Sequence, residues 1–474
     1  MNILEKEFIQ PNLWKVLSFK FNITLFFLFL PSLMYGQGQS PSSGQGVFDT
    51  NYISTLVGPG GFMWDLNNAQ YEVPKDSGKH SIFAHDHWLG GVDDGGALRL
   101  AAMTYRQGGN DLWAGPCSNQ PVHGTGAYSQ KWDRVWKINI DEIQNHIFNH
   151  SMPNYQMPEA IENWPAHGDT LLGQEFHLAP FIDINNNGIY EPQIGDYPKV
   201  KGHQSLYMIR NDIGNIHTES QCDPIGIEQH LMFYGYRCDN VPALNYTLFA
   251  EMKLYNRGTN NMNDFYVGTW TDTDLGYYLD DYVGCNVNKN LGFCYNGDAI
   301  DEGAQGYGFN PPAQGLVYLN DDMEHFMYYY NNSTVIGNPS QGIHFYNYLR
   351  GIWKDNVPLT FGGDGHGGGN GATTDQCNYM FPNLTDPQFP NTPWTEVTSG
   401  NIPSDRRFLM SAGPIYLGSG DMYHLDYAFV WARDSGGGNL ASVNLLFNYV
   451  DDIKSFYQNP TPNICVILGC TDSV

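Results

Sequence analysis

The chain has 474 residues, and 23 Lys and Arg set against 49 Asp and Glu give a formal net charge of -26 at pH 7. Nucleic acid phosphates and anionic membrane surfaces repel such a polyanion, so we expect no nucleic-acid partner. Only 15% of residues are charged, whereas 14% are aromatic and 53 Gly and 27 Pro are present. This composition excludes a disordered acidic tail and a coiled coil, and it favours a mainly β protein with long loops.

An apolar run near the N-terminus has the features of a secretory signal. Residues 21–36 read FNITLFFLFLPSLMYG, follow Lys15 and Lys20, and precede the polar stretch GQSPSSGQG. The run is too short for a good spanning helix, and no other stretch approaches about 18 apolar residues. We therefore expect a signal peptide over 1–36, a secreted, extracellular or cell-surface location, and no membrane span after signal removal. An uncleaved N-terminal anchor is the alternative.

The remaining chain predicts an antiparallel β-sandwich architecture with few short helices. Polar residues over 37–57 predict a linker, followed by a β-rich domain over 58–235 and a second β-sandwich domain over 236–460. Short apolar or alternating runs alternate with Gly, Asn, Asp and Pro, and helical periodicity is scarce. The exceptions are a closing helix capped by Asn439 and a short helix from Asp141.

Two strand pairs stand out in the second half of the chain. Residues 247–257 and 264–272 alternate in polarity on either side of GTNNMN, and residues 407–417 and 422–433 flank GSGD. We expect each pair to be joined by its turn, with the first strand half-buried in an antiparallel sheet.

The segment FIDINNNGIYEP matches an oxygen-ligand calcium loop. Ca²⁺ prefers hard oxygen donors, and a tight loop turns alternate side chains inward around a Gly. Position 12, normally a bidentate Glu, is Ile194, so a later acid has to supply the last ligand. The predicted ligands are Asp183, Asn185, Asn187, the carbonyl of Ile189, Glu191 and Asp196. An Asx-rich turn without metal is the alternative.

A second group of acids lies in TDTDLGYYLDDYVG, just after a predicted strand. Such acids repel one another unless a cation or hydrogen bonds offset their charge, and Ca²⁺ is the natural extracellular cation. Solvated loop acids, a hydrogen-bond network and the carboxylate pair of a polysaccharide hydrolase are the alternatives. The members are Asp272, Asp274, Asp280 and Asp281.

Eight cysteines fit an exported chain, and none lies in a CxxC pair, which disfavours a thiolate zinc site. Cys285 and Cys294 flank turn-forming residues, a spacing that predicts a local disulfide across a hairpin. Cys222 and Cys238 are a further possible pair.

Two other sets of residues have competing interpretations. His85 and His87 share one face of a predicted strand, as zinc ligands can, but the segment also fits an ordinary strand. Aromatic residues around Tyr346 and Trp353 fit a sugar-stacking platform or, more simply, a sandwich core. No GxSxG elbow and no phosphate loop is present in the sequence.

Several segments together resemble uncharacterised large secreted surface proteins of Bacteroidota that carry a C-terminal type IX secretion sorting domain. The resemblance extends over roughly 60–455 and implies export and a surface location, not a reaction. It also implies that 461–474 begins a Cys-containing repeat or linker in which Cys465 and Cys470 find partners; the sorting domain itself is not in this sequence. The segments include GGFMWDLNNAQYEVPK, SIFAHDHWLGGVDDGGALRLAAMTYRQGGNDLWAGP, QKWDRVWKIN, HTESQCDPIGIE, YVGTWTDTDLGYYLDDYVGCNVNKNLGFCYNGD and DRRFLMSAGPIYL.

The sequence therefore predicts a secreted, calcium-stabilised β-sandwich protein with an adhesion or binding role and no evident catalytic site. Its expected ligand is an extracellular glycan or another surface ligand. A secreted polysaccharide hydrolase that uses the Asp cluster, and a carbohydrate-binding module, are the alternatives.

Overall fold

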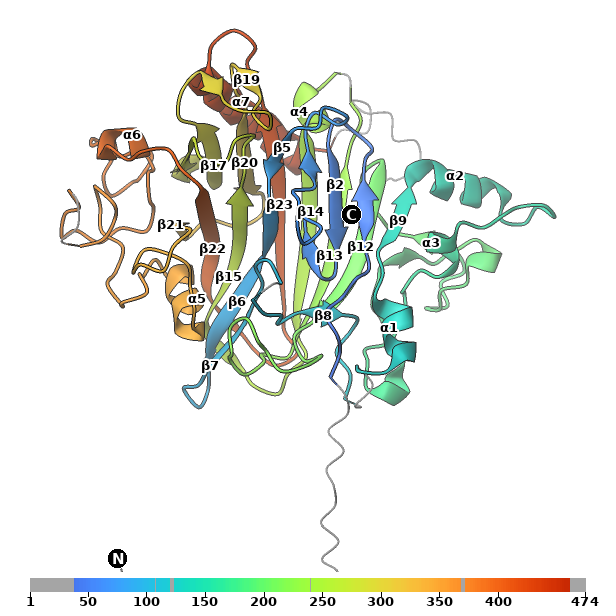
Figure 1. The fold of residues 1–474 in the computed structure, drawn as a ribbon. Helices are drawn as coiled ribbons and strands as arrows, with labels where there is room; N and C mark the ends of the chain where they lie inside the picture. Colours follow the sequence, from blue (N-terminus) through green and yellow to red (C-terminus); the bar gives the residue numbers. More distant parts are fainter. Residues whose placement is uncertain (1–37, 107, 120–122, 239, 368–370, 461–474) are drawn as a thin grey trace, which may run out of the picture. The chain divides into compact units, whose positions relative to one another are not determined.

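The computed structural model describes residues 38–460 except 107, 120–122, 239 and 368–370 (Figure 1). The predicted signal and the predicted C-terminal repeat lie outside the described residues. The described chain is mainly antiparallel β and forms two large sheets of ten and nine strands. Side chains from both sheets meet in one core, where the rings of Phe62 and Phe233 lie 4.9 Å apart. The predicted β-sandwich class is confirmed.

The ten-stranded sheet contains strands from both ends of the described chain. Its order is β21 (His325–Tyr330), β22 (Arg406–Leu417), β15 (Met262–Thr273), β6 (Ala84–Asp93), β3 (Gly61–Phe62), β2 (Ser54–Gly58), β4 (Tyr71–Glu72) and β5 (His80–Ile82), with β1 (Gly46–Phe48) on β2 and β7 (Leu98–Ala102) on β6.

The nine-stranded sheet faces it. Its order is β16 (Asp281–Asn286), β17 (Leu291–Asn296), β20 (Ala313–Tyr318), β23 (Met422–Ala432), β14 (Thr247–Asn256), β13 (Ile227–Gly235), β12 (Gln204–Asn211) and β8 (Trp113–Ala114), with β9 (Trp136–Asn139) on β12. Two small sheets pair β10 (Phe181–Ile182) with β11 (Tyr197–Pro198) and β18 (Ile300–Asp301) with β19 (Gly308–Phe309).

Seven α-helices and three short 3₁₀ turns lie outside the sheets in the described chain. They are α1 (Gly126–Trp132), α2 (Ile140–Asn149), α3 (Glu159–Glu162), α4 (Pro242–Asn245), α5 (Gly342–Leu349), α6 (Glu396–Ser399), α7 (Asn439–Gln458), η1 (Thr170–Leu172), η2 (Pro192–Ile194) and η3 (Val287–Lys289). In Figure 1 α1, α2 and α3 lie on one side of the strands, and α5 and α6 on the other. None of the described helices is long and apolar enough to cross a bilayer.

Both predicted helices are present, with small differences at their starts. The helix expected from Asp141 is α2, in which the backbone N–H of Asn139 donates to Glu142 at 2.8 Å as a cap. The closing helix is α7, but Gly438 holds the cap position that was predicted for Asn439. Val450 and other apolar residues of α7 pack on the outer face of the nine-stranded sheet and complete a second core there.

Strand β14 has the predicted alternation, but both of its faces are covered. Leu248 and Met252 face the core between the sheets, whereas Phe249 faces the second core and is 1% exposed. The expectation of a half-buried strand is therefore wrong at Phe249, because α7 covers the sheet face that would otherwise meet solvent.

The two predicted strand pairs exist as strands but not as pairs. Strand β14 pairs with β13 and β23 in one sheet, while β15 pairs with β6 and β22 in the other. Each short connection, between β14 and β15 and between β22 and β23, therefore carries the chain from one sheet to the sheet that faces it. A turn sequence marks where a strand ends, but it does not specify whether the chain returns alongside or crosses over.

Two expected boundaries also differ from the structure. Residues 37–57, predicted as a linker, contain β1 and most of β2, and Phe48 and Ile53 are fully buried. No division falls at 235, because β13, which ends there, pairs along its length with β14, and the described residues form one compact unit. Sheet hydrogen bonds thus join the two predicted domains.

A fully buried ion pair connects the two sheets. The guanidinium of Arg210 on β12 donates to both carboxylate oxygens of Asp86 on β6, at 2.9 and 3.2 Å, and neither side chain is exposed. Arg210 also donates to Gln229 at 3.0 Å, and its guanidinium lies 4.6 Å from the ring centre of Phe62.

The two histidines predicted to share a strand face do so inside the sandwich. The ring nitrogens Nε2 of His87 and His85 lie 2.8 and 3.2 Å from the hydroxyl of Tyr427 on the opposite sheet. Burial lowers the pKa of His85 to about 3 and the pKa of His87 well below its usual value, so both imidazoles are neutral at pH 7. Contacts within the core thus occupy these nitrogens.

We expect Arg210→Met to destabilise the fold by about 3–5 kcal/mol, because it leaves the Asp86 carboxylate buried without its counterion. Arg134→Met is the matched control: Arg134 pairs with Glu159 at 3.2 Å, but the two side chains are 37% and 73% exposed, so its loss costs at most about 1 kcal/mol. Denaturant unfolding measures both. Adding Asp86→Asn to Arg210→Met is expected to recover part of the loss, and equal effects of the two arginine variants would contradict this role.

Candidate metal and binding sites

The predicted calcium loop folds around the carboxylate of Asp183. This carboxylate accepts hydrogen bonds from the backbone N–H groups of Gly188, at 2.7 Å, and Asn187, at 3.3 Å. The turn requires a left-handed backbone at Gly188, where φ is 79°, and at Asn186, where φ is 58°. Backbone N–H groups of the loop therefore hold the carboxylate of Asp183, the first predicted ligand, in place.

Three further predicted ligands converge on the open side of this loop. The amide nitrogens of Asn187 and Asn185 lie 2.6 and 3.4 Å from one oxygen of Glu191. The two orientations of an Asn amide differ by a rotation that exchanges its nitrogen and oxygen, so the same positions can present oxygens to a cation. The arrangement can offer carboxylate and amide oxygens to one hard ion.

Asp196 supports the loop in a different manner from the one predicted. It is fully buried, and its two carboxylate oxygens accept hydrogen bonds from the backbone N–H groups of Ile184, at 2.9 Å, and Glu191, at 2.8 Å. It thus joins the two ends of the loop. The backbone of Ile189 donates to Asn187 at 2.7 Å, and the side chain of Ile194 is exposed.

The structure divides the four acids of the second predicted cluster into two groups. Asp272 and Asp274 meet Asp405, and carboxylate oxygens of these three residues lie within 4.8 Å of one another. Asp281 is fully buried and accepts from the backbone N–H of Leu275 at 3.1 Å. Asp280 is half-buried, and one of its oxygens accepts from the backbone N–H of Glu302.

Asp272 lies at the end of β15, opposite Arg407 on β22. One carboxylate oxygen of Asp272 accepts hydrogen bonds from Arg407, at 3.0 Å, and from the hydroxyl of Tyr105. Arg407 also donates to that hydroxyl at 2.7 Å and pairs with Asp405. A buried guanidinium and a phenol therefore hold Asp272 in place.

Burial is the main cause of altered proton affinity in this region. It raises the pKa of Asp272 to about 6, against the opposing effect of Arg407. Burial and then the charges of Asp272 and Asp405 raise the pKa of Asp274 well above its usual value. Burial, followed by a side-chain contact with Glu302, raises the pKa of Asp280 to about 7. Ionisation of these acids therefore lowers the stability of the folded state.

The two alternative functions place their key residues in the interior. Asp272 and Asp281 are 1% and 0% exposed, so a polysaccharide chain does not reach them as it would reach a glycosidase pair. The rings around Tyr346 and Trp353 are not a sugar platform, because these side chains are 3% and 0% exposed and pack into the core. The simpler interpretation of these aromatic residues is correct.

The predicted disulfide is absent: Cys285 and Cys294 are buried free thiols. On paired strands β16 and β17, Cys285 lies opposite Gly292 and Cys294 opposite Val283, so the two cysteines are diagonal neighbours. Diagonal positions are farther apart than the Cβ separation of about 3.5–4.5 Å that a disulfide needs. Cys222 is also free, which excludes its pairing with Cys238.

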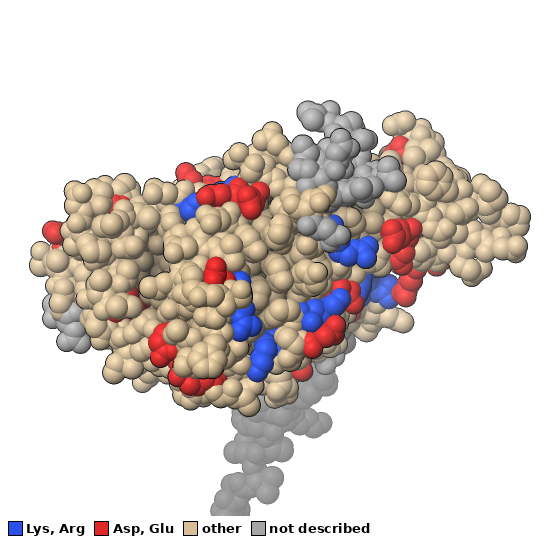
Figure 2. Space-filling view, turned by 90° about the horizontal axis from the view of Figure 1, so that it is seen from above, with Lys and Arg blue, Asp and Glu red and all other residues tan. Residues whose placement is uncertain are grey.

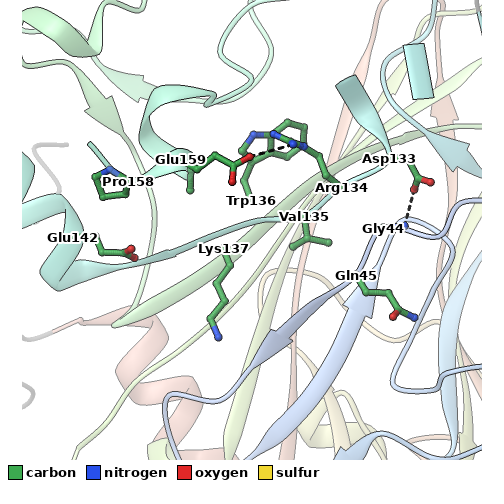
Figure 3. Close-up of a pocket in the computed structure, with 11 residues that line it drawn as sticks. Gly44, Gln45, Asp133, Arg134, Val135, Trp136, Lys137, Glu142, Pro158 and Glu159 are labelled. Atoms are coloured by element: carbon green, nitrogen blue, oxygen red, sulfur yellow. Dashed lines mark hydrogen bonds and ion pairs between the residues drawn. The ribbon is translucent and has the colours of Figure 1, made fainter. Parts of the chain in front are cut away.

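A polar hollow of about 500 Å³ opens beside β9 (Figure 3). Arg134 and Glu159 pair across it, and Asp133 accepts from the backbone N–H of Gly44 at 2.8 Å. Lys137 lines the same hollow and pairs with Asp49 at 2.8 Å. In the view of Figure 2 most Lys and Arg side chains likewise lie beside Asp or Glu. Such a surface suits a polar, uncharged or weakly charged ligand.

Sequence reasoning missed three members of the Asp272 group: Tyr105, Asp405 and Arg407. Tyr105 and Asp405 are each more than 130 residues from Asp272, so spacing along the chain does not connect them. A signal was nevertheless present in DRR at 405–407, where three charged residues directly precede the apolar run of a strand. Charged residues at the start of a strand with both faces buried require partners.

The fold and these sites define a two-sheet antiparallel β-sandwich protein with two separate clusters of oxygen donors. Neither a protein-family model nor a curated protein matches the sequence. The family resemblance therefore stays a prediction.

The free thiols can be tested chemically. Because Cys285 and Cys294 are buried and burial raises the pKa of both thiols well above the usual value, we expect neither to react with iodoacetamide in the native protein. After unfolding without reductant, mass spectrometry should find both residues alkylated. A peptide pair linked through Cys285 and Cys294 would contradict the structure.

The raised pKa of Asp280 predicts a pH-dependent stability. Its ordinary value is 3.8 and its value in the fold is about 7, so the folded state holds the proton more tightly and loses stability as pH rises through about 7. We expect Asp280→Asn to raise Tm at pH 8 in chelator, and to raise it less at pH 5. The exposed Asp375→Asn is the control, and a gain that does not depend on pH would contradict the assignment.

Proposed function

We propose that the protein is a secreted, cell-surface β-sandwich module that is stabilised by Ca²⁺ and has an adhesion or binding role. The observation that carries the proposal is the loop from Asp183 to Glu191, in which Asp183 closes a Gly turn and three further predicted ligand side chains meet one another. Oxygen donors from Asp and Asn at alternating positions are the ligands that Ca²⁺ prefers.

The location rests on the sequence. An apolar N-terminal run with a polar continuation supports export, and the resemblance to surface proteins of Bacteroidota supports the type IX route. Ca²⁺ is abundant outside cells, where weak sites of about 10⁻⁴–10⁻³ M are occupied in extracellular modules. An exposed loop that lacks the position-12 Glu suits that range.

The binding role rests on the hollow beside β9. Its lining combines Arg134, Lys137 and Glu159 with Gly44 and Gln45, so it offers hydrogen-bond donors and acceptors and charges of both signs. Sugars present hydroxyl groups that both donate and accept, and polar side chains of this kind recognise them. An extracellular glycan is therefore the ligand that we propose.

Thermal unfolding with Ca²⁺ and with chelator tests the calcium part of the proposal. A ligand that binds only the folded state raises stability by about 2.7 kcal/mol at a concentration of 100 times its Kd. We expect Ca²⁺ to raise Tm of the wild type and of the exposed control Glu162→Gln, and to raise it less in Glu191→Gln, which removes a ligand charge but leaves the Asp183 turn intact.

A glycan array and a cell-binding assay test the role itself. We expect the Ca²⁺-loaded protein to bind without turnover, and Arg134→Ala to weaken that binding. A fold indifferent to Ca²⁺ that binds neither glycans nor cells would contradict the proposal.

A further inference from the structure

The carboxylate of Asp272 has one oxygen that the protein leaves without a partner. Oδ2 accepts from Tyr105 and Arg407, but Oδ1 has no hydrogen bond within the described part of the chain, although the side chain is 1% exposed. A buried polar atom without a partner costs roughly 1–3 kcal/mol, and a charged one costs more. Such an atom points to a group that completes it.

Two neighbouring acids lie close to the Asp272 carboxylate. Carboxylate oxygens of Asp272, Asp274 and Asp405 lie within 4.8 Å of one another. Asp405 accepts from Asn331 at 3.1 Å and pairs with Arg407, which leaves lone pairs free on both oxygens. The described residues donate no hydrogen bond to the Asp274 carboxylate. Ligand oxygens of Ca²⁺ lie about 2.3–2.6 Å from the ion, so two of them are at most about 5 Å apart.

The charge of this group is not balanced by the protein. When ionised, Asp272, Asp274 and Asp405 carry three negative charges, and Arg407 supplies one positive charge. Another acidic group, around Glu251 and Asp426, shows the contrast: Lys201 and Lys253 pair with Glu251, and Tyr457 and His424 bond Asp426. Protein side chains thus balance the acids around Glu251 and Asp426. The Asp272 group, when ionised, keeps an excess of two negative charges, which one divalent cation would balance.

We infer that Asp272, Asp274 and Asp405 form a second cation site, for Ca²⁺ or a similarly hard divalent ion, with Asp272 Oδ1 as its buried ligand. Asp274 and Asp405 are partly exposed, so an ion can enter from solvent and keep water ligands there. The site deepens the proposed function, because it would connect the end of β15 to the segment that enters β22.

The test uses Ca²⁺, and Tb³⁺ as a luminescent probe, on the mature chain in three forms. These are Glu191→Gln, which disables the loop site, the double variant Glu191→Gln with Asp274→Asn, and Glu191→Gln with the exposed control Asp375→Asn. The ring of Tyr105 lies 5.1 Å from that of Trp270, so aromatic excitation near Asp272 is expected to sensitise bound Tb³⁺.

We expect Glu191→Gln and its Asp375→Asn control to keep a Ca²⁺-dependent rise in Tm and a sensitised Tb³⁺ signal that Ca²⁺ displaces. Adding Asp274→Asn should abolish both, without lowering Tm in chelator, because it removes repulsion from the ion-free group. Glu191→Gln with Asp405→Asn, at the solvent side, repeats the test if the Asp274 variant misfolds.

The outcomes separate this inference from the proposed loop site. Loss of all Ca²⁺ binding in Glu191→Gln alone would overturn the inference and leave the loop site standing. Retention of Ca²⁺ binding when Asp274→Asn or Asp405→Asn is added to Glu191→Gln would also overturn it, since the remaining ion would then lie elsewhere. Loss through Asp274→Asn with no effect of Glu191→Gln would support the inference and remove the loop site.

Discussion

The fold depends on burying one positive charge, the guanidinium of Arg210, between two sheets and away from water. Arg210 is fully buried, and it meets that constraint through Asp86, Gln229 and the face of Phe62. Moving a guanidinium out of water costs several kcal/mol unless its partners are geometrically well placed. Because Asp86 lies on one sheet and Arg210 on the other, these bonds form only when the sheets face each other in one register. The ion pair therefore selects a particular sandwich among the many that apolar residues alone would allow.

Local features of the fold could be predicted from the sequence, whereas long-range partners could not. The polarity pattern of 247–257 located β14, and the helical periodicity after Asn439 located α7. The same patterns could not show that β14 and β15 belong to different sheets, because a short turn serves either arrangement. The predicted calcium ligands Asn187 and Glu191 meet because the loop that joins them is short. Asp405 joins Asp272 only through the pairing of β15 with β22.

The protein manages its excess of acids in two different ways. Most exposed acids on the face in Figure 2 lie in solvent, where repulsion is weak. In the interior, Glu396 forms an ion pair with the buried Arg406 at 2.9 Å. Asp212 accepts hydrogen bonds from three backbone N–H groups. The group at the end of β15 stands apart because its carboxylates share one arginine. The remaining negative charge of this group, when ionised, is therefore balanced by protons or cations from the solution.

The crossing of the chain between sheets has a consequence for how the protein comes to be folded. Strand β14 pairs with β23 and β15 pairs with β22, far along the chain. The contact between His85 and Tyr427 joins residues 342 positions apart. Closing such long loops is slow, and folding rates fall as contacts become less local. The central strands of a growing chain keep open edges until nearly all of it is available, and open edges aggregate. A holding chaperone, or transport of the chain while it is still unfolded, would keep these open strand edges from aggregating.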